Sequence, residues 1–249
     1  MDQYGLHTNT YHAFPVECAI ETAGRLSLPS IELSAVKGWT EHVMSSFPQK
    51  RIAEIEEKLR SLGLAVPVLS AHSDLSMPER VEDFLVSIQL ARRLGCRTIV
   101  TSCGEAHFGR ETLNERALLD GLQRALDVCA AEGLQLALET HGAYGSGARL
   151  MELLVKVGNP LLGIAYDTAN VTRHGHVYPE DDLRLCAGFV KHVHLKDKTG
   201  AFDGRTFTAL GEGWIDFPTI FSILDCAGYD GMYALEVEYF EPQSPTRER

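Results

Sequence analysis

The sequence predicts an α/β fold in which eight parallel strands, separated by helices, close into a (β/α)₈ barrel that forms one domain over residues 1–249. Three observations predict this fold. Short apolar segments alternate with amphipathic ones along the whole chain, as in parallel sheets covered by helices. The length of 249 residues is close to the roughly 250 residues typical of such barrels. No GxGxxG follows the first strand and no GxxxxGK occurs, so a doubly wound open sheet is the weaker alternative.

Eight segments predict strands, because each is short, mostly apolar and bounded by turn residues or by a helical pattern. Eight units of this kind favour a closed barrel over an open sheet. In chain order the segments are YGLHTN (4–9), SIEL (30–33), LAVPVLSAH (64–72), CRTIVTSCG (96–104), LQLALETHG (134–142), LLGIAYDTAN (161–170), VKHVHLKD (190–197) and MYALEVEYF (232–240).

Six amphipathic segments between these strands predict helices. In PQKRIAEIEEKLRSLG (48–63), Ile52, Ile55 and Leu59 fall on one helical face, and Gly63 stands where a helix commonly ends. The other five segments follow the same pattern, with proline near the start or glycine at the end of most of them. They are residues 78–95, 112–133, 147–160, 179–189 and 216–229.

The last covering helix of the barrel is expected to be short or missing. The segment EPQSPTRER (241–249) is polar and interrupted by proline, so it does not predict a helix. Apolar surface would then remain between the first and seventh helices, where a partner subunit can bind. We therefore expect a homo-oligomer, and light scattering that finds a monomer at micromolar concentration would contradict this.

Composition excludes several classes of function. Asp and Glu number 34 against 23 Lys and Arg, and the formal charge of −11 opposes binding to nucleic acid. The six cysteines are scattered without a CxxC pair, which indicates reduced thiols in a cytoplasmic protein. Neither an export signal nor a membrane span is expected, because the start is polar and no apolar run reaches about 18 residues.

Polar side chains stand at the ends of nearly all the predicted strands. In a (β/α)₈ barrel the chemistry lies at the carboxyl ends of the strands, so these residues are candidates for a functional site. In chain order they are His7, Glu32, His72, Asp74, Glu139, His141, Asp167, Asn170, His194, Asp197, Glu236 and Glu238.

Four of these residues, from consecutive strands five to eight, predict a metal site: Glu139, Asp167, His194 and Glu236. The acids follow apolar residues at the rim of the core, where an uncompensated carboxylate is costly. Taken singly, each has an ordinary alternative, such as a helix cap, an Asx-turn or the solvent face of a strand. Together they favour one divalent ion, and three carboxylates with one imidazole suit manganese, magnesium, cobalt or iron(II).

The motifs LALETHG, AYDTAN, HVHLKD, LGEGWIDF and GMYALEVE, in this order, resemble the sugar phosphate isomerase/epimerase superfamily of xylose isomerase-like TIM barrels. That superfamily includes ketose 3-epimerases, hydroxypyruvate isomerase and inosose dehydratase. The resemblance covers essentially the whole chain and implies the same four ligands, with Glu139 and Glu236 also acting as the acid/base pair. It implies that His192 packs inside the barrel with a hydrogen-bond partner. One position departs from the ketose 3-epimerases, which usually carry histidine where this chain has Asn170.

The activity implied is that of a metal-dependent sugar or keto-sugar isomerase or epimerase. Glu139 and Glu236 would remove and return a proton next to a carbonyl through a metal-stabilised enediolate, with Mn²⁺ the expected ion and Mg²⁺, Co²⁺ or Fe²⁺ the alternatives. A dehydratase of a keto-polyol, of the inosose or dehydroshikimate type, is the alternative on the same site. A non-catalytic sugar-binding barrel is a possibility of a different class. The abasic-site endonucleases of this scaffold are disfavoured by the negative charge.

Further residues are expected to contact a carbohydrate substrate, although structural roles in loops or in hydrogen bonds explain them equally well. The aromatic ones would stack on a sugar ring. The loops at 141–147 and 198–213 are long or glycine-rich enough to act as lids. The expected contacts are His7, Glu32, Trp39, His72, Phe108, Asn170 and Arg205.

Overall fold

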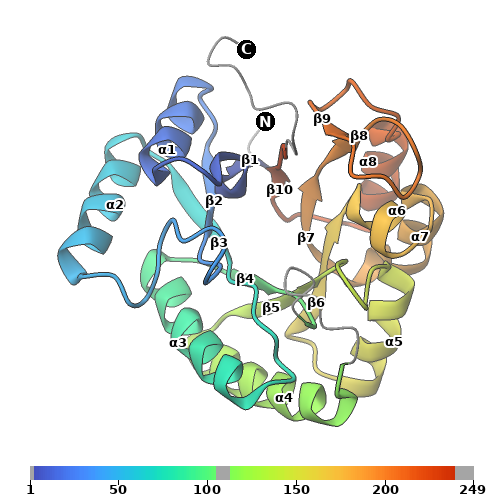
Figure 1. Ribbon diagram of the computed structural model, residues 1–249, viewed down its shortest axis with the longest axis horizontal. Helices are drawn as coiled ribbons and strands as arrows, with labels where there is room; N and C mark the ends of the chain where they lie inside the picture. The colour runs from blue at the N-terminus through green and yellow to red at the C-terminus, as the bar shows by residue number, and fades with distance from the viewer. Residues whose placement is uncertain (1–2, 105–112, 239–249) are drawn as a thin grey trace.

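The computed structural model describes residues 3–104 and 113–238, and its eight parallel strands close into a barrel with the helices on the outside (Figure 1). Around the barrel the strand order is β1-β10-β7-β6-β5-β4-β3-β2. The predicted fold class is therefore confirmed. The strands are β1 (Tyr4–His7), β2 (Ser30–Ser34), β3 (Ala65–Ser70), β4 (Thr98–Thr101), β5 (Gln135–Glu139), β6 (Leu162–Asp167), β7 (Val190–Leu195) and β10 (Tyr233–Leu235).

All six predicted helices are present, and two more were not predicted. Glycines end several of them: Gly95, Gly133 and Gly158 take left-handed φ values of 82°, 71° and 66° at the C-caps of α3, α4 and α5. The helices are α1 (Val16–Arg25), α2 (Gln49–Ser61), α3 (Pro78–Leu94), α4 (Glu115–Glu132), α5 (Gly147–Val157), α6 (Asn170–His174), α7 (Pro179–Cys186) and α8 (Phe217–Cys226). None of these helices is long and apolar enough to cross a membrane.

Inside the barrel, small apolar residues lie below the acids. Ala137, Ala165 and Ala234 belong to one buried cluster with Val68 and Val100. Because side chains alternate along a strand, the residue two positions further on points to the same interior. Those residues are Glu139, Asp167 and Glu236, so the alternation brings three acids to the carboxyl end of the barrel.

The loop after β7 is ordered by an antiparallel ribbon of β8 (Asp197–Lys198) and β9 (Phe207–Thr208). The Asp197 carboxylate accepts hydrogen bonds from the backbone N–H groups of Gly211 and Gly213, each at 2.9 Å. A Cβ on Gly213 would lie 2.0 Å from Asp197 Oδ1, so only glycine allows this approach.

The end of the chain lies outside the described residues. β10 ends at Leu235, and the expected extension of this strand to residue 240 reaches beyond residue 238. The expected lack of a last helix concerns residues 241–249, which are not described. That expectation therefore stays a prediction.

Candidate metal centre

The four predicted ligands lie together at the carboxyl ends of four adjacent strands, β5, β6, β7 and β10. One ligand atom from each of Glu139, Asp167, His194 and Glu236 lies within 4.8 Å of the others, and all four residues are buried. Two ligands on opposite sides of one divalent ion are about 4.2 Å apart, so the cluster has the span of a single ion.

One oxygen of each carboxylate is held by a hydrogen bond and the other is not. Asp167 Oδ1 accepts the backbone N–H of Asn170 at 2.8 Å, and Glu236 Oε1 accepts the Asn9 amide at 2.9 Å. Glu139 Oε1 accepts the Asn170 amide at 3.4 Å. The second oxygens of all three acids are buried and accept no hydrogen bond of normal geometry from the described residues. They face cations at ion-pair distance instead, His72 at Glu139 and Lys196 at Asp167 and Glu236. Three carboxylates and one imidazole within the span of one ion are a donor set that fits a divalent cation.

His194 is oriented by a buried acid behind it. Its Nδ1 faces the ligand set, 3.2 Å from Glu139 Oε1, whereas its Nε2 lies 3.1 Å from both oxygens of Glu32. A carboxylate behind a histidine fixes the ring and favours the tautomer whose other nitrogen binds metal. Glu32 also binds His192 Nε2 at 2.7 Å, so His192 is packed inside the barrel with a partner, as the resemblance implied.

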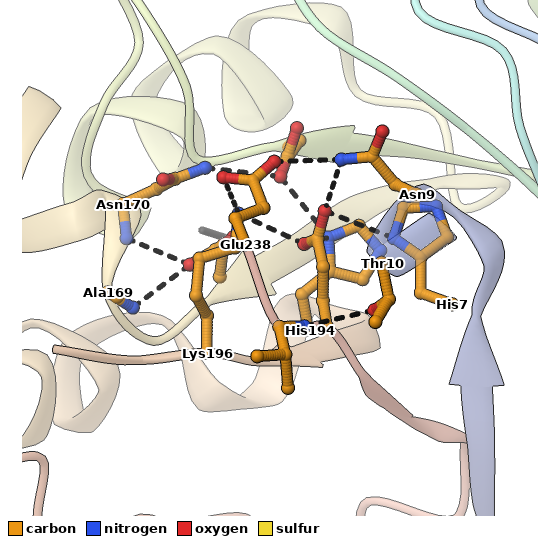
Figure 2. A network of polar contacts seen from close by, with 12 residues as sticks. His7, Asn9, Thr10, Ala169, Asn170, His194, Lys196 and Glu238 are labelled. Atoms are coloured by element: carbon orange, nitrogen blue, oxygen red, sulfur yellow. Dashed lines mark hydrogen bonds and ion pairs between the residues drawn. The ribbon is translucent and has the colours of Figure 1, made fainter. Parts of the chain in front are cut away.

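Lys196 places a cationic side chain in this site, and the sequence analysis did not predict it. Its Nζ lies 3.0 Å from Asp167 Oδ2, 3.1 Å from Glu236 Oε2 and 3.3 Å from Glu238 Oε2. Figure 2 shows Lys196 reaching the same polar network as His194 and Glu238. Burial alone would lower the pKa of Lys196, but these carboxylates hold it well above its ordinary value. His194 and Lys196 are two apart in HVHLKD, so strand alternation was the signal that pointed to it.

The two candidate bases remain ionised although they are buried. Burial would raise the pKa of Glu139, but the His72 and His194 imidazoles hold it well below its ordinary value. Lys196 and His7 have the same effect on the pKa of Glu236. Both carboxylates are therefore in the ionised form that a general base requires.

A cavity of about 160 Å³ opens beside the ligands. His7, Trp39, His72, Asn170 and Arg205 line it, as expected of substrate contacts, whereas Glu32 is fully buried and does not. His7 Nδ1 lies 3.2 Å from Glu236 Oε1, and His72 Nε2 lies 3.0 Å from Glu139 Oε2. Phe108 lies outside the described residues. Lining residues that were not predicted include Asn9, Arg173 and His174.

The pH dependence of stability should reveal the environment of His174. Burial, and next the charge of Arg173, lower the pKa of His174 to about 4 from 6.5. Between these values the unfolded chain binds a proton that the folded chain does not, so the free energy of unfolding falls as the pH is lowered from 6.5 to 4. His174→Gln should reduce this slope by at most about 1.4 kcal/mol per pH unit, the value for one proton. Urea unfolding from pH 4 to 7 measures it, and parallel profiles for the two proteins would contradict it.

Comparison with known proteins gives matches along most of the chain. A family described as the xylose isomerase-like TIM barrel matches residues 20–249. The inosose dehydratase of Geobacillus thermodenitrificans is 30% identical over 143 aligned positions, and the match covers 49% of this chain and only 46% of that relative. The L-ribulose-5-phosphate 3-epimerase of Salmonella paratyphi C is 24% identical over 249 aligned residues, 93% of this chain and 86% of the epimerase.

Solved structures share the fold at low sequence identity. The IOLI protein with a bound zinc atom superposes with a TM-score of 0.78 at 14% identity, covering 94% of this chain and 88% of that one. At this identity the likeness concerns the fold.

Proposed function

This chain belongs to the xylose isomerase-like TIM barrel family, and from that premise we propose that it is a divalent-metal-dependent enzyme that removes a proton next to a carbonyl of a sugar or keto-polyol. One observation carries the proposal: carboxylate oxygens of Glu139, Asp167 and Glu236 and a ring nitrogen of His194, all buried, converge within 4.8 Å of one another. Similarity to an epimerase and a dehydratase of sugar substrates supports it.

The ion would be held by Glu139, Asp167, His194 and Glu236, and when bound it supplies Lewis-acid polarisation of a carbonyl oxygen. We propose Mn²⁺, because the ligand set is rich in oxygen. Glu32 would keep the His194 ring in place by accepting a hydrogen bond from its Nε2–H group. Glu32 would then act by positioning His194 and would not contact the ion itself.

Two bases are available for the proton transfer. Glu139 ends β5 and Glu236 follows β10, with β6 and β7 between these strands, so the two carboxylates approach a substrate from different sides. One takes the proton from one face of the carbon, which leaves an enediolate, and the other delivers a proton to the opposite face. The product is the epimer. Return to the neighbouring carbon gives the isomer instead.

The cavity provides contacts that would orient a polyol. His7 and His72 each approach one of the two bases, and Asn170 donates its amide to Glu139. Trp39 stacks on His12 with 4.2 Å between the ring centroids, which holds its indole at the cavity wall. An indole in this position can cover a face of a sugar ring. Arg205 would bind a group at the solvent side.

Dehydration of a keto-polyol is the second candidate, and Lys196 favours it. Elimination of water requires a donor for the leaving hydroxyl beside the base, and Lys196 Nζ lies 3.1 Å from Glu236 Oε2. The 30% identity to an inosose dehydratase supports the same reaction. A homo-oligomer also remains our proposal.

Product analysis separates the two reactions. The manganese-loaded enzyme is incubated with ketoses, ketose phosphates and a keto-inositol, and the products are identified by NMR. We expect an epimer or isomer of one substrate; a product that has lost water would establish the second candidate. If no member of the panel changes although manganese is bound, both candidates are wrong.

A further inference from the structure

Two arginines from different segments line the solvent side of the cavity. Arg173 lies in α6, three residues after Asn170, and Arg205 lies in the turn between β8 and β9. Arg173 is partly exposed and Arg205 is exposed, whereas His194 at the metal centre is buried. Both arginines therefore border the same cavity as the metal centre, at positions nearer to solvent.

Arg173 is partly buried, whereas other described arginines for which no ion pair is found, such as Arg92 and Arg184, are exposed. Arg51 and Arg93, on α2 and α3, lie 2.6 Å and 2.9 Å from the carboxylates of Glu17 and Glu56. Arg173 makes no hydrogen bond or ion pair with any residue within 3–104 and 113–238. Burial lowers the pKa of Arg173, the neighbouring charge of Arg205 lowers it further, and the more weakly acting charge of Glu238 raises it. Two like charges are thus held beside one cavity in a chain with a formal charge of −11.

The segment that carries Arg205 is held in place by its own contacts. The β8–β9 ribbon pairs Lys198 with Phe207, and Thr199 N–H donates to Thr206 O at 2.8 Å. Lys198 Nζ also donates to Thr172 Oγ1 at 3.2 Å, which ties the ribbon to the helix of Arg173. The two arginines are therefore positioned relative to one another by ordered structure.

We propose that Arg173 and Arg205 form an anion subsite and that the substrate of this enzyme is a keto-sugar or keto-polyol carrying a phosphate or a carboxylate. A guanidinium binds either group through paired, charge-assisted hydrogen bonds. The anion would lie at the solvent side while the carbonyl end of the substrate reaches Glu139 and Glu236. This inference rests on the proposed function for the identity of the bound molecule, but the binding of an anion itself does not require turnover.

Matched substrates test the subsite and separate its two sources. The manganese-loaded enzyme is assayed with a ketopentose, its 5-phosphate and a keto-polyol carboxylate. Arg173→Gln and Arg205→Gln should each raise KM about 10- to 100-fold for the anionic substrate that is used, with little change in kcat. If KM rises for the 5-phosphate, the subsite binds a phosphate. If KM rises for the keto-polyol carboxylate, the subsite binds a carboxylate. Arg173→Lys should recover part of the loss, and Arg124→Gln, on the outer face of α4, is the control.

Calorimetric titration with inorganic phosphate, and separately with acetate, gives a readout that does not depend on catalysis. We expect one of these anions to bind to the wild-type enzyme at least tenfold more tightly than to Arg173→Gln. If the anion binds in this way but no substrate turns over, the subsite stands and the proposed function fails. If a neutral ketose turns over and neither arginine variant changes KM or anion binding, the subsite is wrong and the proposed function stands.

Discussion

Glu236→Gln is expected to lower the rate at which the enzyme interconverts the two epimers by about 10²- to 10⁴-fold, the usual contribution of a positioned general base. Glutamine keeps the size of the side chain but cannot accept the proton. It also places an amide beside the Lys196 ammonium, where Glu236 Oε2 now lies 3.1 Å from Nζ. The measurement is kcat with the metal content of each preparation determined in parallel, because Glu236 is also a candidate ligand.

The companion variant Glu139→Gln makes this prediction sharper. With two bases on opposite sides of the substrate, either variant should block the interconversion of the two epimers. Each variant keeps one base, so it should still exchange the substrate proton of one epimer with solvent. The epimer that exchanges should differ between Glu139→Gln and Glu236→Gln. Glu212→Gln, in the exposed part of the loop after β9, should retain full activity. A Glu236→Gln enzyme that binds metal and interconverts both epimers at the wild-type rate would show that Glu236 is not a base.

Removal of the metal is expected to abolish turnover and to destabilise the fold. Without an ion, Glu139, Asp167 and Glu236 share a buried cluster compensated by Lys196 and the surrounding histidines. An ion that binds only the folded chain adds about 4 kcal/mol to the free energy of unfolding at a free concentration roughly 1,000 times its Kd. EDTA treatment followed by manganese should remove and then restore both activity and this stability, as measured by urea unfolding.

His194→Gln separates the metal from general effects of EDTA. This variant should lose most of the manganese-dependent increase in stability, because it lacks the imidazole ligand. His176→Gln, at an exposed position, should retain it. Full turnover by enzyme shown to be free of metal would overturn the metal site.

The strands, and the meeting of the four candidate ligands at one end of the barrel, could be predicted from sequence because both depend on local pattern. Glu139, Asp167 and Glu236 each end an apolar strand, and parallel strands bring such ends to one rim. Lys196 was missed because only His194 and Asp197 were selected as functional candidates at the end of the strand VKHVHLKD, although alternation places Lys196 on the same face as His194. Helix α1 was missed although Val16, Ala19, Ile20 and Ala23 are spaced on one helical face.

Contacts between distant parts of the chain could not be predicted from pattern. The Asn9 amide binds both Glu236 and Glu238, residues 227 and 229 positions away, and nothing in the local sequence of Asn9 indicates this. Arg173 belongs to a helix of five residues, which is too short to have a recognisable period. Its position beside Arg205 follows from the packing of the β8–β9 ribbon against α6.

The most direct test of the central claim is proton NMR of substrate in D₂O with the manganese-loaded enzyme. The account predicts that deuterium enters at the carbon next to the carbonyl. This exchange should be lost after metal removal, and in Glu236→Gln it should be lost for the epimer whose proton Glu236 removes. Absence of exchange with every ketose, ketose phosphate, keto-inositol and keto-acid tested, on enzyme with bound manganese, would contradict it.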